Sequence, residues 1–344
     1  MVCVRKVLRR KHNPTDIAAG LLDQKMSQGH AFVSIIVPMY NTEKYIHDTL
    51  VSILQERSTF IEVIVVNDKS SDGSLGRVQE FDDRRLKVIE GPGCGAPGAM
   101  NAGLASVNGS IIMICDADDL YPAGRISQQI RWLNDHPDCD AVCGSYSTID
   151  SGGNLVARMQ CGDSPVEITD ELINGKLRTS FCTYAVRSSL IQKVGKFREF
   201  FKSSYDIDFQ LRLGEAGRIA YVPEDWYFYR IHPSSITHSQ PDSVRRSFEQ
   251  KAFELQRQRR TSGLDDLQRG CSLSSPSVDR SAPLSAVDHI QGQLLGRAWR
   301  EHGAGKRGLA LRTGVRALAA NPLNMGAWKS MVALALKPLP NSPR

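Results

Sequence analysis

The sequence predicts an α/β protein: a mostly parallel mixed sheet with helices on both faces, followed by a small C-terminal helical module. In the first half of the chain, short apolar segments alternate with segments suited to helices. This alternation is typical of buried parallel strands and their crossover helices. Each apolar segment ends in polar or loop-forming residues, and near the C-terminal end apolar residues recur at helical spacing instead.

The first part of the predicted sheet comes from four continuous apolar runs. Ligands of open α/β sheets bind outside the carboxyl ends of the strands, so we expect the functional site where these runs end. The expected strands cover 32–37, 61–66, 86–89 and 111–115, and the expected helices between them cover 42–56, 74–83 and 98–107.

The second part of the sheet has a mixed pattern, and we expect it to complete the sheet and to form the acceptor side of the site. It contains helical patterns at 122–135 and 205–216 and strand-like segments at 140–148, 154–160, 181–187, 219–222 and 226–231.

Four further segments flank the α/β domain, which we place at 32–240. Residues 1–31 show no sustained periodicity and are expected to be a flexible basic arm. Residues 241–262 resemble a basic helix, and 263–286 are rich in Ser and Pro, which is typical of a linker. Apolar residues at helical spacing predict a helical module over 287–338.

The net charge of +6 is unevenly distributed along the 344 residues. The first 31 residues carry a net +4, residues 32–244 a net −8, and residues 245–344 a net +10. Basic ends of this kind suit contact with anionic lipid or another anionic polymer, and the alternative is a solvated basic helix surface. We expect no nucleic-acid partner.

No apolar segment approaches the ~18 residues of a membrane-spanning helix. Basic residues at 5–11 are not followed by the apolar segment of a secretory signal. We therefore expect a cytoplasmic protein that can lie peripherally at the inner membrane surface. The eight cysteines, at 3, 94, 115, 139, 143, 161, 182 and 271, contain no Cys-x-x-Cys pair, so we expect buried, reduced, structural roles.

The strongest local signal is the sequence Asp116-Ala117-Asp118-Asp119 after the fourth strand. Carboxylates so close together repel one another unless a cation or protons neutralise them. Mg²⁺ and Mn²⁺ prefer oxygen ligands that are shared with substrate phosphates. These residues therefore indicate a divalent metal site, and the alternative is a cluster that caps a following helix.

The second and third strands also end in residues that could bind a ligand. Asp68 can accept hydrogen bonds from a base or a ribose, whereas Asp72 is expected to cap the next helix. The segment 93–98 spells Gly-x-Gly-x-x-Gly, the fingerprint of dinucleotide-binding proteins, so a nicotinamide-dependent oxidoreductase is one alternative function. The other interpretation is a tight loop that leads into the helix carrying Asn101.

Three residues in the second half are candidates for chemistry. Asp206 opens a helix, where the helix dipole favours a carboxylate, and it could also be the general base that removes a proton from the acceptor hydroxyl. Arg230 could bind a phosphate oxygen and His232 could ligate a metal.

Together, residues 33–41, 63–74, 95–119 and 205–213 resemble glycosyltransferase family 2, whose members have the Rossmann-like GT-A fold, and the resemblance covers about residues 32–235. It implies inverting transfer in a single displacement from a nucleotide-diphosphate sugar, usually a uridine-linked one. It further implies a nucleotide-sugar site and a metal site. The residues that match are Pro38, Tyr40 and Glu43 near the nucleotide, Asp68 at the base, Asn101 in the donor site, Asp116 at the ribose or the metal, Asp118 as main metal ligand, and Asp206 as catalytic base.

The sequence departs from this family at two positions. Met100 replaces a common arginine, and Tyr205 replaces the glutamate of an acidic Glu-Asp pair. A Gln-x-x-Arg-Trp sequence at 128–132 is similar to that of processive synthases, but without membrane-spanning segments we expect non-processive transfer.

The sequence therefore predicts a glycosyltransferase that uses Mn²⁺ or Mg²⁺ and a nucleotide-sugar donor. The expected acceptor is a hydroxyl of a carbohydrate or lipid-linked molecule, as in cell-envelope or exopolysaccharide synthesis. A catalytically impaired sugar-nucleotide-binding module is the alternative that the two departures suggest.

Overall fold

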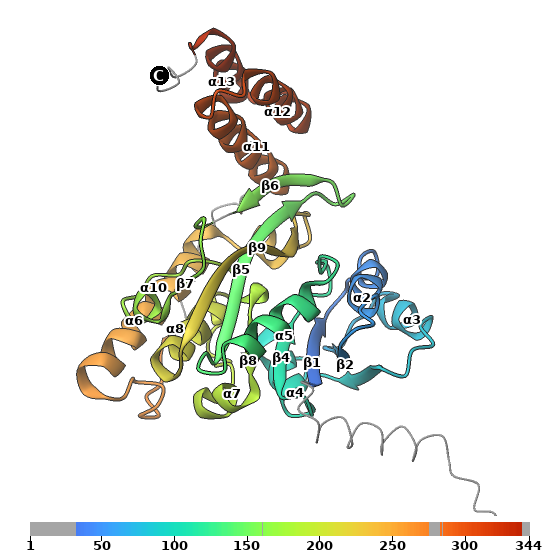
Figure 1. Ribbon diagram of the computed structural model, residues 1–344, viewed down its shortest axis with the longest axis vertical. Coiled ribbons are helices and arrows are strands. Elements are labelled where there is room, and N and C mark those ends of the chain that lie inside the picture. The colour runs from blue at the N-terminus through green and yellow to red at the C-terminus, as the bar shows by residue number, and fades with distance from the viewer. Residues whose placement is uncertain (1–31, 160, 275–282, 284, 339–344) are drawn as a thin grey trace, which may run out of the picture.

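A computed structural model describes residues 32–159, 161–274, 283 and 285–338. Its described residues form one central sheet covered by helices, with a group of three helices at one end (Figure 1). The strand order is β3-β2-β1-β4-β8-β5-β9-β7, and β6 pairs with β5 outside this path. The predicted α/β class and the separate C-terminal helices are confirmed.

The first half of the sheet is parallel, as the apolar runs predict. Strand β1 (Phe32–Met39) pairs with β2 (Phe60–Asn67) and β4 (Ile111–Ile114), and β2 pairs with β3 (Leu86–Glu90). Because Met39, Asn67 and Glu90 are aligned in register, these strands end at one edge. The connecting helices are α2 (Ile46–Leu54), α3 (Ser74–Gln79) and α4 (Ala96–Leu104).

The second half makes the sheet mixed. Strand β5 (Ala141–Ile149) is parallel to β9 (Ile219–Arg230) and antiparallel to β6 (Leu155–Met159) and β8 (Ala185–Arg187). Strand β8 is also antiparallel to β4, and β7 (Val166–Glu167) is antiparallel to β9. The helices of this half are α5 (Arg125–Asp135), α6 (Thr169–Ile173), α7 (Ser188–Val194), α8 (Tyr205–Ala216), α9 (Ile236–Ser239) and α10 (Asp242–Ser262).

Some predicted elements differ from the structure. Residues Phe181–Thr183 form a 3₁₀ turn rather than the start of a strand, because Arg125 Nη2 donates to the Cys182 carbonyl at 2.6 Å and holds the chain in the turn. Strand β9 is continuous where two strands were predicted, since register shifts against β5 absorb the irregular residues in its middle. Strand β3 is an edge strand and is largely exposed, not buried.

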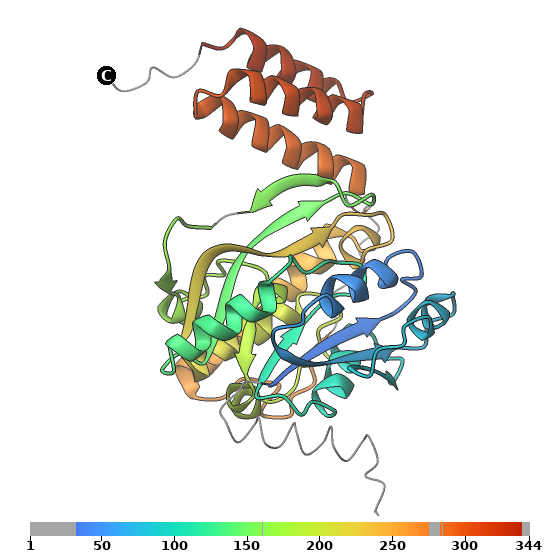
Figure 2. The same cartoon turned by 45° about the vertical axis from the view of Figure 1, so that its right-hand side comes forward.

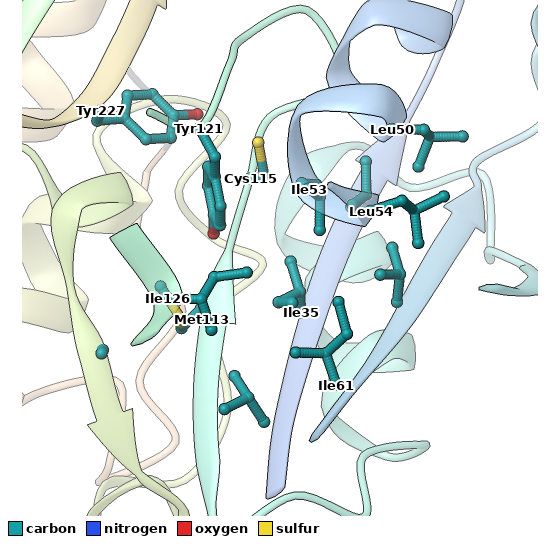
Figure 3. Close-up of a cluster of buried hydrophobic side chains, with 14 of the residues drawn as sticks. Ile35, Leu50, Ile53, Leu54, Ile61, Met113, Cys115, Tyr121, Ile126 and Tyr227 are labelled. Atoms are coloured by element: carbon teal, nitrogen blue, oxygen red, sulfur yellow. The ribbon is translucent and has the colours of Figure 1, made fainter. Parts of the chain in front are cut away.

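Alternate residues of the central strands face two separate cores, as the two-residue repeat of a strand requires. Ile35 faces the core beneath α2 and α5, and Ile36 faces the core beneath α4 and α8. Figure 3 shows the first core, in which Cys115, Tyr121 and Tyr227 gather beside the carboxyl end of β4. The loop after β4, which carries Asp116, Asp118 and Asp119, therefore extends from a packed part of the core.

Helix α10 belongs to the α/β domain. It packs on α8 through Phe248, Ala252 and Leu255. The following residues differ from the predicted linker, because Asp265 is fully buried between Arg198 (2.8 Å) and Arg259 (2.6 Å). The later part of the predicted linker, 275–282 and 284, lies outside the described residues, as does the predicted arm 1–31.

The C-terminal module consists of α11 (Ala286–Gly303), α12 (Arg307–Ala320) and α13 (Met325–Leu336). Leu294 of α11 and Ala317 of α12 pack against Val156 and Ala157 of β6. Figures 1 and 2 place α11 next to β6 and the other two helices farther from the sheet. Among the described residues, no helix combines the length and apolarity needed to cross a lipid bilayer.

The seven described cysteines are free. Three are buried, as predicted, namely Cys115, Cys139 and Cys143. Cys94 and Cys271 are exposed instead, because each lies in a surface loop.

Candidate active site

The loops after β1 and β2 are hydrogen-bonded to each other at the carboxyl edge of the sheet. The Glu43 N–H donates to Asp72 Oδ2 at 3.1 Å, and the Gly73 N–H donates to Glu43 Oε2 at 3.1 Å. Asp72 also accepts the Ser74 N–H at 3.0 Å, at the start of α3, which is the capping role predicted for it. Glu43 therefore holds the two loops together and lies at the edge where the resemblance places the nucleotide.

Pro38 and Tyr40 lie at the end of β1. Pro38 is half-buried in register with Val66, and Tyr40 is 61% exposed. The exposed phenol ring of Tyr40 is thus free to stack on a flat ligand at this edge.

Asp68 anchors the glycine-rich loop after β3. Its Oδ1 accepts the Gly93 N–H at 2.7 Å, and its Oδ2 accepts the Gly95 N–H at 2.9 Å. Gly93 and Gly95 have φ values of 74° and 91°, a backbone region that favours glycine. These two N–H groups point at a carboxylate, so they do not form the phosphate cradle of a dinucleotide-binding loop. Each carboxylate oxygen keeps a second lone pair, but Asp68 is buried, and its predicted hydrogen bond to a base stays a prediction.

The acidic loop, residues 116–119, follows β4 and contains one structural carboxylate and two that border the site. Asp119 is buried and accepts the Arg230 N–H at 2.6 Å, which joins the loop to β9. Burial, followed by the charges of Asp118 and Asp116, raises the pKa of Asp119 well above its ordinary range. Asp119 therefore holds the loop in place, while Asp116 and Asp118 are only partly buried.

Asp118 contacts the segment after β9. Its Oδ2 lies 2.8 Å from His232 Nε2, and its carbonyl accepts Arg230 Nε at 2.7 Å. Ser234 Oγ lies 2.9 Å from the other ring nitrogen of His232 and orients the imidazole. The two predicted metal ligands, 114 residues apart in the sequence, are thus adjacent in the structure.

Asp116 lies against β9 and the 3₁₀ turn. Its N–H donates to the Tyr227 hydroxyl at 3.0 Å, and the Cys182 thiol donates to Asp116 Oδ2 at 3.2 Å. Burial, the charge of Asp118 and that of Asp206 raise the pKa of Asp116 to about 7, despite the Cys182 hydrogen bond, which lowers it. A carboxyl group in this state loses its proton readily to a competing cation.

Asp206 lies in the first turn of α8, and its charge acts on Asp116 of the acidic loop. The helix begins after Ser204, which has a φ of 56°. Burial raises the pKa of Asp206, and Glu249 of α10 adds to the shift, whereas the backbone N–H groups of the first turn and Arg245 oppose it. The predicted base and the predicted metal-site residues therefore border one site.

Tyr205 also borders this site. Burial, Asp116 and Asp206 raise the pKa of its hydroxyl well above the ordinary range, and its ring packs edge-on against Phe197. The residue that replaces the family's glutamate thus places a neutral phenol among carboxylates.

Asn101 makes contacts within the fold. Its amide donates to the Phe197 carbonyl and accepts the Phe197 N–H, both at 2.9 Å, and thereby fastens the segment before α8 to α4. Both polar ends of this side chain are occupied, so the donor contact implied by the resemblance stays a prediction.

The sequence analysis missed three residues that shape the site. Tyr45 lies between Arg230, at 4.9 Å from its ring, and the His232 ring, at 4.6 Å. Tyr227 and Arg125 support the acidic loop from below: the Arg125 guanidinium is 3.8 Å from the Tyr121 ring and 5.3 Å from the Tyr227 ring. Tyr45 follows the end of β1, where the sequence predicts a functional site. No spacing pattern distinguishes any of the three from ordinary core residues.

The geometry defines a class of protein: an α/β nucleotide-binding fold with carboxylates at the carboxyl edge of the sheet. Residues 34–201 match the sequence profile of glycosyl transferase family 2. This matched segment belongs to the family, which leaves the oxidoreductase alternative without support.

Relatives and solved structures agree with this family. An uncharacterized glycosyltransferase of Rickettsia prowazekii is 30% identical over 219 residues, which are 60% of this chain and 66% of that protein. Glycosyltransferase GlyG of Streptococcus pneumoniae is 28% identical over 225 residues, which are 61% of this chain and 74% of that protein. Residues 1–349 of TarS from S. aureus, solved with UDP-GlcNAc, share the fold at a TM-score of 0.51 and 18% identity, covering 88% of this chain and 79% of that one.

Proposed function

We propose that this protein transfers a sugar, with inversion, from a nucleotide-diphosphate sugar to a hydroxyl acceptor and that a divalent cation assists the reaction. The observation that carries the proposal is the convergence of Asp116, Asp118 and Asp206 at one edge of the sheet, where the charges of Asp118 and Asp206 both act on Asp116. Such a concentration of negative charge suits a site that binds a cation together with a diphosphate.

Asp118 and His232 are the residues that would hold the metal. Among the described residues, no three His, Cys, Asp or Glu side chains form a complete metal cage. This fits Mg²⁺ or Mn²⁺ in a transferase, since Mg²⁺ takes one or two carboxylates from the protein and the remaining ligands from substrate phosphates and water. When bound, the metal would neutralise the charge of the leaving diphosphate.

Arg230 is the residue that we propose binds the diphosphate. Its guanidinium is buried beside the acidic loop, and its Nη2 is without a hydrogen-bond partner among the described residues. A buried donor without a partner has a free-energy cost, which a phosphate oxygen would offset.

Asp206 is the proposed catalytic base. Its raised pKa makes it a better proton acceptor than an exposed aspartate. It would take the proton from the acceptor hydroxyl as the oxygen attacks the sugar. Tyr205 is a neighbour whose hydroxyl is available to orient either sugar.

A UDP-linked sugar is the donor we propose, because TarS, which shares the fold, was solved with UDP-GlcNAc. Asp68, Tyr40 and Glu43 would border its nucleotide. The proposed acceptor is a carbohydrate or lipid-linked molecule of the kind used in cell-envelope or exopolysaccharide synthesis. We also propose non-processive transfer, because Gln128 and Trp132 of the synthase-like sequence make contacts within the fold, with Trp226 and His136 respectively.

A test of this function measures both donor binding and donor hydrolysis by Asp206→Asn. Loss of a general base typically lowers the rate by ~10²–10⁴-fold, so we expect UDP-sugar binding with Mn²⁺ to persist while hydrolysis falls by that factor. Hydrolysis by the variant at the wild-type rate would remove Asp206 as the base.

The second candidate is a protein that binds the sugar nucleotide without turning it over, and Tyr205 in place of a carboxylate is the observation that favours it. Met100 argues less for it, because this residue is buried in the core beneath α4 and not in the site. If the wild-type protein bound UDP-sugars but hydrolysed and transferred none of them, the second candidate would replace the first.

A further inference from the structure

Helix α13 has an apolar face that the fold leaves uncovered. Met325, Trp328, Val332 and Leu336 are 68%, 45%, 55% and 77% exposed. At 100° per residue these four side chains fall within one narrow stripe along the helix. We call Met325, Trp328, Val332 and Leu336 the α13 stripe.

The opposite face of α13 makes the packing contacts of the module. Ala327 and Leu334 are buried there, and Ser330 accepts the Trp299 indole N–H at 2.9 Å. Gly314 of α12 gives room to Met331, because an added Cβ on Gly314 would lie 2.5 Å from its sulfur. The module is therefore packed without the α13 stripe, which needs another explanation.

The module that carries the α13 stripe is basic in composition. Residues 287–338 contain eight Lys or Arg and two Asp or Glu. Both carboxylates are engaged within the module: Asp288 binds Ser285 and Asn321, and Glu301 binds Arg297 and Thr313. Lys329, next to the stripe, has no ion pair in the described part of the chain and is exposed.

We propose that the α13 stripe docks on an anionic lipid surface. An interfacial helix buries an apolar stripe at the boundary between headgroups and acyl chains, with Lys and Arg beside it. Each basic residue near an anionic membrane adds about 1 kcal/mol of attraction. Trp is a residue enriched at this boundary, and the Trp328 indole is held in place by its bond to the Pro322 carbonyl at 2.8 Å.

Charge distinguishes a lipid surface from a second copy of the chain. Two copies joined through this face would bring two modules with the same excess of positive charge together, and the repulsion opposes association. An anionic bilayer instead complements the charge.

Figure 1 shows β1 running toward the end of the molecule that carries the module, so the carboxyl edge with the acidic loop faces that end.

The experiment measures binding of the full chain to vesicles by flotation. One set of vesicles is phosphatidylcholine alone, and the other is an equal mixture with phosphatidylglycerol. We expect binding to the mixed vesicles only, weakened by salt because the Debye length falls from about 10 Å at 0.1 M to about 3 Å at 1 M. Val332→Ser with Leu336→Ser should raise the dissociation constant at least about tenfold, since two aliphatic side chains no longer enter the interface.

Leu264→Ser is the matched control, because this leucine is 49% exposed on the α/β domain and its loss should leave vesicle binding unchanged. Lys329→Glu should weaken binding to the mixed vesicles, whereas Arg84→Glu, an exposed residue between α3 and β3, should not. Donor hydrolysis in vesicle-free buffer should be unchanged in all four proteins, which separates this proposal from the proposed function.

Two outcomes would overturn the proposal. One is equal vesicle binding by wild type and the double serine variant, which would assign the binding to another basic segment. The other is absence of binding to the mixed vesicles together with dimers in light scattering that the double variant abolishes, which would make a second copy the occupant of the stripe.

Discussion

His232 Nε2 lies 2.8 Å from Asp118 Oδ2 and thereby connects the segment after β9 to the loop after β4. Neither side chain has another charged group of opposite sign as a direct partner among the described residues. Both follow the carboxyl ends of their strands, and Asp118 is partly exposed whereas the His232 side chain is buried. The pair is the centre of the proposed cation site, and the following predictions test it and its surroundings.

His232→Gln should weaken metal-dependent UDP binding about 10–100-fold, the range seen when a residue that ligates or orients a ligand is removed. The fold should persist, because the imidazole contacts polar groups at the edge of the site. Calorimetric titration of UDP with Mn²⁺ measures the effect. His47→Gln is the control, since His47 is exposed on α2, and a similar loss in both variants would contradict a specific role for His232.

The raised pKa of Asp116 should make the stability of the metal-free protein depend on pH. Because its pKa rises from 3.8 to about 7 on folding, this carboxyl group binds a proton more tightly in the folded protein. Its stabilising contribution is complete below the unfolded-state pKa and is lost as the pH rises through about 7. Wild type should therefore lose more stability than Asp116→Asn between about pH 5 and pH 8.

Urea midpoints in the presence of EDTA measure this difference. Asp48→Asn, at a position whose side chain is 66% exposed, should follow the wild-type curve. Parallel curves for wild type and Asp116→Asn would show that Asp116 titrates normally.

Gly91→Ala should destabilise the protein, because a Cβ at this position would lie 2.6 Å from Asp68 Oδ1. Forcing an extra carbon into packed structure typically costs about 1–3 kcal/mol, and the displaced carboxylate would also release the N–H groups of Gly93 and Gly95. We expect a lower urea midpoint and weaker UDP binding. Gly76→Ala is the control: nothing lies within 4 Å of its added carbon, and alanine favours a helix by about 1 kcal/mol.

Asp265→Asn should destabilise the α/β domain by about 3–5 kcal/mol, because it leaves Arg198 and Arg259 buried without full compensation. Its neighbour Asp266 forms a partly exposed pair with Arg269, and Asp266→Asn should cost no more than about 1 kcal/mol. Chemical denaturation of both variants compares them. Equally small losses of stability in the two variants would mean that residues 263–274 are a linker, as their composition suggests.

Strands β1, β2 and β4 of the parallel half could be predicted because each is a continuous apolar run that is buried. Short elements such as α6, α7 and β7 were missed, since tertiary contacts determine them more than local pattern. The turn at Phe181–Thr183 depends on Arg125, which lies 57 residues from the carbonyl of Cys182 that it binds. No local rule contains that contact.

The site was predictable to the extent that it lies at strand ends. The positions of Asp116 and Asp118 follow from the end of β4, but the contact between Asp118 and His232 depends on the path of β9. The same holds for Asn101: the resemblance to the family implied a ligand contact, whereas its amide binds the Phe197 backbone 96 residues away. Side-chain partners of this kind come from three-dimensional packing and have no signature in the sequence.

The most direct test of a cation held at Asp118 is the affinity of Asp118→Ala for UDP with Mn²⁺ and with EDTA. We predict that wild type binds UDP at least about tenfold, or 1.4 kcal/mol, more tightly with Mn²⁺ than with EDTA, and that the variant binds equally in both. Full metal-dependent affinity in Asp118→Ala would contradict the account.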